Sequence, residues 1–100
     1  MPNTFKTLYR GAAATSSATL YTVPAATSTL ISTILVVNTS GSNQTYTITL
    51  DGVSIATTTP LPANDTAVLE IKQHLGTTKI IAGLASATTV NFHITGIEIT

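Results

Sequence analysis

Polar and apolar residues alternate along most of this chain with a period of two, which is the spacing of a strand with one buried face. The alternation is clearest at residues 44–50, where Tyr46, Ile48 and Leu50 share one face and threonines occupy the other. No stretch of about eleven or more residues has apolar positions at helical spacing together with capping residues. We therefore expect an all-β chain with no substantial helix.

Turn-forming residues divide the chain into about eight predicted strands. These are residues 4–10, 19–23, 29–38, 44–50, 53–58, 66–72, 79–85 and 90–99. Short strands at such regular spacing are typical of a β-sandwich, so we expect a single antiparallel, jelly-roll-like sandwich over residues 1–100. Residues 1–10 form either an N-terminal arm or an edge strand of it.

Two turn signals lie near the middle of the chain. Asp51-Gly52 is a favoured pair for a two-residue type I′ hairpin turn. Pro60 and Pro62 are expected to end the preceding strand, because proline cannot join a central ladder. Three Asn-x-Ser/Thr sequences are interpreted as turn residues; they begin at Asn38, Asn43 and Asn64.

Two of the predicted strands depart from simple alternation. Residues 29–38 are apolar on both faces near their end, which predicts a central strand that is covered on both sides. In the last strand, Phe92 and Ile94 share one face, whereas Ile97 and Ile99 lie on the other. Gly96 stands between the two pairs and predicts a β-bulge that switches faces.

Charge is scarce, at 8% of residues, with four Lys/Arg, four Asp/Glu and a formal net charge of zero. Ordinary globular proteins carry about a quarter charged residues. A neutral chain lacks the basic surface that binds nucleic acid or an anionic membrane. The longest apolar run, residues 30–37, is much shorter than the roughly 20 residues of a membrane span. The N-terminal region lacks the apolar core of a signal peptide, so we expect no export by that route.

Candidate catalytic groups are few and carry no recognisable spacing. The chain has no cysteine, no Gly-x-Ser-x-Gly sequence and no glycine-rich phosphate loop. The available bases and acids lie at predicted turns, strand ends or strand exteriors: His74, His93, Asp51, Asp65, Glu70 and Glu98. Two isolated histidines do not make a metal-ligand set. We expect no enzymatic activity, no cofactor and no metal.

The N-terminal segment is the candidate partner interface. Two of the five aromatic residues and half of the basic residues fall within six positions, in the set Phe5, Lys6, Leu8, Tyr9 and Arg10. Aromatic residues and arginine are enriched at interface cores. An edge strand whose apolar side chains pack in the core of its own sandwich would explain the same pattern, and the sequence leaves both interpretations open.

Four stretches carry a resemblance that spans about residues 5–100. They are Leu20-Tyr21-Thr22-Val23-Pro24-Ala25, residues 34–41, residues 61–70 and residues 90–99. In this order, the chain resembles small β-sandwich structural proteins of tailed-bacteriophage virions. Similar proteins often carry Gly-Asp before the penultimate strand, whereas this chain has Gly76-Thr77-Thr78-Lys79, which alters a loop and a surface charge.

The resemblance implies a non-enzymatic virion component that is made in the host cytoplasm. Within that class two roles compete, and the first is a capsid cement (decoration) protein, commonly a homotrimer, that binds the major capsid protein. A compact chain without a fibrous extension favours cement over the alternative, a module associated with the tail, baseplate or fibres. A carbohydrate-binding sandwich is the third alternative, but this chain has no tryptophan and only three tyrosines for an aromatic platform.

Overall fold

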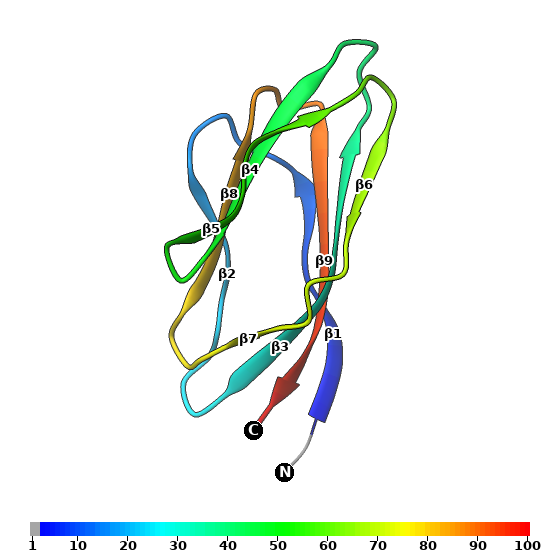
Figure 1. Ribbon diagram of the computed structural model, residues 1–100. Helices are drawn as coiled ribbons and strands as arrows, with labels where there is room; N and C mark the ends of the chain where they lie inside the picture. The colour runs from blue at the N-terminus through cyan, green and yellow to red at the C-terminus, as the bar shows by residue number, and fades with distance from the viewer. Residues whose placement is uncertain (1–2) are drawn as a thin grey trace.

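The computed structural model describes residues 3–100, which form strands joined by turns and loops, with no helix. Residues 1 and 2, part of the N-terminal segment singled out above, lie outside the described residues. The strands of the described chain are β1 (Asn3–Ala12), β2 (Ala18–Thr22), β3 (Ser28–Asn38), β4 (Gln44–Leu50), β5 (Val53–Leu61), β6 (Thr66–Leu69), β7 (Gln73–Leu75), β8 (Ile80–Ala85) and β9 (Val90–Ile99) (Figure 1). The prediction of an all-β chain is confirmed.

The strands form two antiparallel sheets that pack face to face (Figure 1). Sheet A has the order β1-β9-β3-β6, with β7 also paired to β3, and sheet B has the order β2-β8-β4-β5. Because β6 and β7 pair with different parts of β3, they act together as one interrupted strand. With β6 and β7 counted as one, this is the strand order of a jelly roll. The predicted jelly-roll-like sandwich is therefore observed.

The core lies between the sheets and is built from alternate residues of each strand. Phe92 and Ile94 of β9, Ile34 of β3 and Ile48 of β4 are completely buried. The prediction for β4 is confirmed: its tyrosine, isoleucine and leucine are buried, while its threonines lie half-buried on the outer face. Burying a large apolar side chain of this kind stabilises the fold by about 2 kcal/mol.

Strand β3 is central in sheet A, as predicted, but only one of its two faces is covered by the other sheet. It lies between β9 on one side and β6 and β7 on the other. Ile34 and Val36 point into the core, whereas Leu35 and Val37 remain half-buried on the outer face of sheet A. The prediction of a doubly covered strand is wrong for the isolated chain, because a two-layer sandwich leaves each sheet with one outer face.

Proline does not end β5 where the sequence analysis placed its end. The strand continues to Leu61, with Pro60 paired opposite Thr45. This is possible because β5 is the edge of sheet B, and an edge strand needs ladder hydrogen bonds on one side only. The position of β5 at the edge, rather than in the centre, explains the error.

The strand predicted at residues 66–72 is interrupted. β6 ends at Leu69 and β7 begins at Gln73, and Lys72 between them has a φ angle of 46°. The positive φ turns the backbone out of regular extended geometry, and the chain leaves the ladder here and rejoins β3 further along. The sequence suggested eight strands because an uninterrupted pattern of polar and apolar residues hides this break.

Gly96 does mark a bulged region, but the extra residues are in the neighbouring strands. β9 itself has no extra residue, whereas β1 has an extra residue at Leu8 and β3 has one at Ser32. The irregularity in β1 lies opposite Thr95 and Ile94, and the one in β3 lies opposite Gly96 and Thr95. The face switch predicted within β9 is wrong, and Ile97 stays on the outer face of sheet A.

The tight turn between β4 and β5 forms as predicted. Asp51 and Gly52 have φ angles of 52° and 77°, both in the left-handed region that a type I′ turn requires. Asn64, interpreted as a turn residue, has a φ of 57° and likewise occupies a turn.

Candidate functional site

The residues of the predicted N-terminal interface fall on different surfaces of β1, an edge strand of sheet A. Leu8 is only 9% exposed and belongs to the core. Phe5 is 68% exposed, and Arg10 is also exposed. Tyr9 is half-buried and its hydroxyl donates to the carbonyl oxygen of Ala12 at 2.9 Å. The segment is thus an edge strand. Leu8 packs in the core of the sandwich, and Phe5 stays on the surface.

Lys6, the fifth member of that set, belongs to a polar cluster at the end of the sandwich near the termini. Its Nζ lies 3.4 Å from Oε1 of Glu98. The other carboxylate oxygen of Glu98 accepts a short hydrogen bond from the Tyr21 hydroxyl, which also lies 3.0 Å from Oγ1 of Thr29. Because Tyr21 comes from sheet B and the others from sheet A, the cluster joins the two sheets.

The environment of Tyr21 disfavours loss of its proton. Burial, together with the hydrogen bond to Glu98, raises the pKa of Tyr21 from 10.0 to about 12. The carboxylate of Glu98 is mostly buried, with 13% of its side chain exposed, and would repel a phenolate. The cluster is therefore held together by a neutral tyrosine that donates to an acid, which is a structural arrangement.

We expect the free energy of unfolding to fall at alkaline pH through Tyr21. Since its folded pKa lies above the unfolded value, this stabilisation is complete below pH 10 and is lost as the pH rises toward 12. Between these limits the advantage of the wild type over Tyr21→Phe should shrink by on the order of 1–2 kcal/mol. Urea denaturation of both proteins at several pH values measures the difference. Burial also raises the pKa of Tyr46, so only the gap between the two proteins isolates Tyr21; a constant gap would contradict the assignment.

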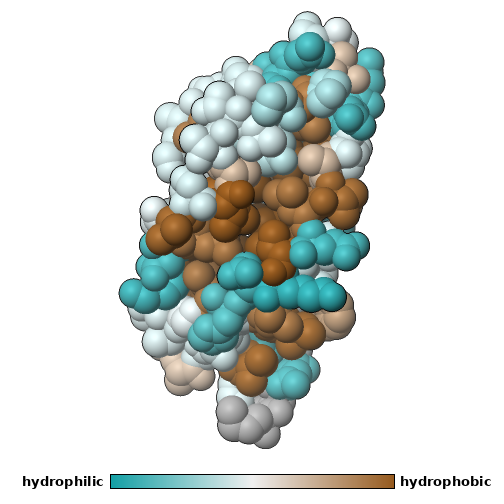
Figure 2. All heavy atoms as spheres, in the orientation of Figure 1, coloured by the Kyte–Doolittle hydropathy of each residue, from teal (hydrophilic) through white to brown (hydrophobic). Residues whose placement is uncertain are grey.

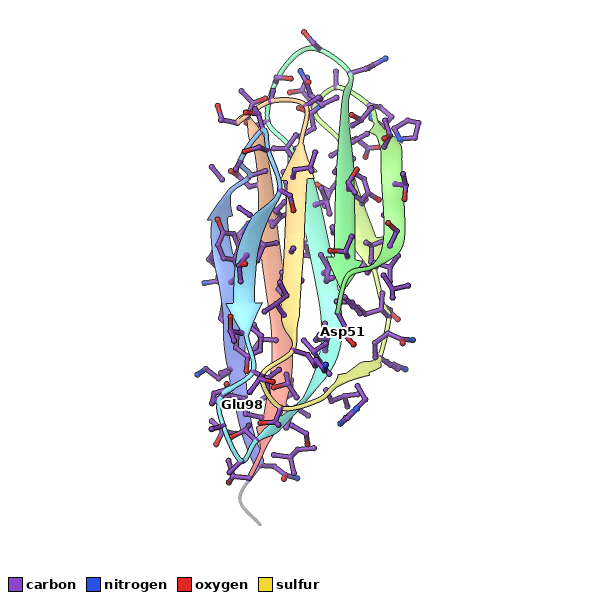
Figure 3. All side chains as sticks on the ribbon, turned by 90° about the vertical axis from the view of Figure 1, so that its left-hand side faces the viewer. Asp51 and Glu98 are labelled. Atoms are coloured by element: carbon purple, nitrogen blue, oxygen red, sulfur yellow. The ribbon has the colours of Figure 1, made fainter. Side chains whose placement is uncertain are left out.

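The groups considered for catalysis do not converge on one place. His74 is exposed in β7, and His93 lies half-buried on the outer face of β9. Figure 3 shows Asp51 at the β4–β5 turn and Glu98 on another side of the molecule. Asp51 pairs with Lys79 at 3.7 Å. Among residues 3–100, no ion pair joins a histidine to a carboxylate, and no three His, Asp or Glu side chains gather as metal ligands would.

A hollow opens at the edge of the sandwich where β5 of sheet B faces β7 of sheet A. Its volume is about 450 Å³. Its walls come from the β4–β5 hairpin and from the segment around β7, and are formed by Leu50, Asp51, Val53, Ile55, Gln73, His74, Leu75, Gly76 and Lys79. Figure 2 shows apolar side chains gathered across the middle of this edge, bordered by polar ones.

The walls of the hollow are mainly apolar, and the opposite charges on its rim cancel. Val53 is 68% exposed and Ile55 39% exposed, and both contribute to its walls. The exposed pair Asp51–Lys79 neutralises the charge on the rim. This arrangement can bind an uncharged apolar group.

Sequence reasoning missed the hollow. Its two sides are about twenty positions apart in the chain, at residues 50–55 and 73–79, and only the strand order brings them together. The available signal was Pro60 within the same strand as Val53 and Ile55. A proline there marks an edge strand, and apolar residues on an edge strand are candidates for an interface.

No known family model matches the chain, and no curated protein or solved structure is significantly similar to it. Within residues 3–100 there is no helix long and apolar enough to cross a membrane.

Proposed function

We propose that this chain is a non-enzymatic structural protein of a tailed-bacteriophage virion, and specifically a cement (decoration) protein that binds the capsid shell. The observation that carries the proposal is the jelly-roll order of the two sheets. That architecture recurs in viral capsid proteins. It agrees with the sequence resemblance to small virion sandwiches, which rests on strands and turns along almost the whole chain.

The surface of the chain supports a role in assembly. Four large apolar side chains are strongly exposed among the described residues, in the set Phe5, Val53, Ile55 and Val68. The outer face of sheet A adds the half-buried Leu35 and Val37. The proposed partners are the major capsid protein and further copies of this chain, with a trimer as the favoured assembly. A neutral surface lets many copies pack side by side without accumulating like charge.

A tail, baseplate or fibre-associated module is the alternative within the same class. Both roles would use a compact sandwich with apolar contact surfaces, but they differ in copy number. A carbohydrate-binding function is the remaining alternative, because jelly rolls also occur in lectins.

The copy number in purified particles of a phage that encodes this chain tests the proposal. Quantitative mass spectrometry against an isotope-labelled standard of the chain should find on the order of hundreds of copies per particle, as repeated shell positions require. Immunogold labelling should then place them on the capsid. A few copies, or a few dozen, would move the chain to the tail or baseplate. Absence from particles, with specific binding on a glycan array, would replace the virion role with carbohydrate binding.

A further inference from the structure

The outer face of sheet A carries large apolar side chains from several of its strands. Leu30, Leu35 and Val37 of β3 point outward and are half-buried. Phe5 of β1 and Val68 of β6 lie on the same face and are 68% and 57% exposed. The apolar pattern of β3 on both of its faces is typical of a strand with a layer on each side, and the chain itself supplies only one of these layers.

The same face is nearly free of charge. Arg10 is the one Lys, Arg, Asp or Glu among the outward positions of the strands of sheet A within residues 3–100. Lys6 and Glu98 belong to these strands too, but they pair on the inner side, where Glu98 also accepts from Tyr21 of sheet B. A layer placed on this face would therefore bury few charges.

A row of three threonines crosses the middle of the face. Thr7 of β1 pairs with Thr95 of β9, which pairs in turn with Thr33 of β3. Along β9, which has no extra residue, Thr95 is two positions from His93 and two from Ile97. The rows of outward residues on either side of the threonines therefore lie equally far from them.

These two flanking rows complement each other. In the order β1, β9, β3, they consist of Phe5, Ile97 and Leu30 on one side and of Arg10, His93 and Leu35 on the other. A rotation of 180° about an axis that follows the threonine row, in the plane of the face, lays each row of one copy over the other row of a second copy. Leu30 then faces Leu35 of the partner, and the Arg10 guanidinium faces the ring of Phe5, an arrangement in which the cation is attracted to the aromatic ring.

We propose that the chain forms a two-fold symmetric dimer through the outer face of sheet A, with the threonine row on the two-fold axis. Four strands about 4.8 Å apart and about ten residues long cover roughly 600 Å². Two copies would bury about 1,200 Å² in total, which is the lower limit for a specific, stable interface. The second copy supplies the layer that β3 lacks.

The charge on the face favours a second copy over a different protein. A face with one cation and no acid lacks the pattern of opposite charges by which a different partner is selected. Apolar surfaces of this kind are typical of contacts between identical subunits. In the dimer, the single cation of each copy meets an aromatic ring of the other instead of a like charge.

The dimer goes beyond the proposed function and does not require it. A two-fold contact produces even-numbered assemblies, which are a dimer or, where the proposed trimer also forms through other surfaces, a hexamer. Each copy still presents the outer face of sheet B to further partners.

Sedimentation velocity of the purified full chain tests the dimer over concentrations from about 1 µM to about 300 µM. The wild type should associate into even-numbered species as its concentration rises. Phe5→Ser and Val68→Ser should each weaken association at least about tenfold, because each removes apolar surface from the contact. Val53→Ser is the matched control: Val53 is 68% exposed, as Phe5 is, but it lies on β5 at the hollow. It should leave association unchanged.

Charged substitutions of Phe5 test the register of the two copies. Phe5→Lys should abolish association, because the ammonium would face Arg10 of the partner, whereas Phe5→Glu should retain it, because the carboxylate would pair with that guanidinium. Within one copy, positions 5 and 10 are about 15 Å apart along β1, so this difference arises between copies. Combining Phe5→Lys with Arg10→Glu exchanges the two charges and should restore association.

Several results would overturn the proposal: a wild type that stays monomeric or forms only odd-numbered species, a loss of association in Val53→Ser, or equal effects of Phe5→Lys and Phe5→Glu. These results are independent of the copy number in virions. Failure of the dimer and failure of the virion role can therefore be told apart.

Discussion

Replacing Gly96 with alanine should lower the free energy of unfolding by about 3 kcal/mol or more. A Cβ atom at this position would lie 2.5 Å from the carbonyl oxygen of Leu30 and 2.9 Å from Cδ1 of Leu8. The oxygen belongs to the backbone of β3, so it cannot rotate away as the end of a side chain can. The central strands β3 and β9 would have to separate, at the position where Leu8 now fills the space beside Gly96.

Gly41→Ala provides the matched control, since a Cβ there would meet no atom within 4 Å. We expect Gly41→Ala to stay within about 0.5 kcal/mol of the wild type. Urea denaturation compares the three proteins, and thermal unfolding should show a drop in Tm of about 12 °C or more for Gly96→Ala. A Gly96→Ala protein as stable as the Gly41→Ala protein would show that β3 and β9 yield at this point without cost.

The positions of the strands could be predicted because each one carries its own local pattern. In β4, alternation alone places Tyr46 and Ile48 in the core, and the Asp51-Gly52 pair fixes the hairpin that follows. Such features depend on neighbours in the chain, and local chemistry is sufficient to specify them.

The irregularities of the ladders could not be predicted, because they depend on residues that meet from distant parts of the chain. The extra residues at Leu8 and Ser32 accompany a glycine more than sixty positions away in the sequence, where β1 and β3 both lie against β9. The break at Lys72 likewise depends on how β6 and β7 share β3. A strand pattern read one segment at a time contains neither relationship.

The candidate site, like the fold, was predictable from the sequence only in part. An aromatic residue near the N-terminus was visible in the sequence, and Phe5 is indeed on the surface, whereas Leu8 of the same segment is in the core. Alternation places Phe5 and Leu8 on opposite faces but does not reveal the bulge at Leu8, which brings Tyr9 opposite the buried Ile94. The hollow required the jelly-roll order itself, which brings Val53 near His74.

Asn38 should be the most sensitive polar position in the protein, and Asn38→Ala should cost about 3 kcal/mol or more. Its side chain is 1% exposed and makes five hydrogen bonds. The two N–H groups of the amide nitrogen are shared among the carbonyl oxygens of Ser42, Leu61 and Pro62, which lie at 2.8, 3.2 and 3.1 Å from the nitrogen. The amide oxygen accepts from the backbone N–H and the hydroxyl of Ser40 at 3.0 and 2.9 Å. One buried side chain thus joins the β3–β4 loop to the end of β5, and its removal leaves buried polar groups without partners.

Asn38→Asp separates the hydrogen bonds from the shape of the side chain. The new carboxylate has nearly the same size, but it would face three carbonyl oxygens. An ionised carboxylate has no hydrogen to donate to them. Burial and these oxygens should raise the pKa of that carboxyl, so the variant should be least stable at neutral pH and should regain stability as the pH falls and the acid becomes protonated.

Asn43→Ala is the control, because Asn43 is exposed and accepts one hydrogen bond, from the N–H of Ala63 at 3.1 Å. Urea denaturation should show a loss below about 1 kcal/mol for Asn43→Ala. Equal losses at the two positions, or an Asn38→Asp protein whose difference from the wild type does not change with pH, would mean that the buried amide does not hold these loops together.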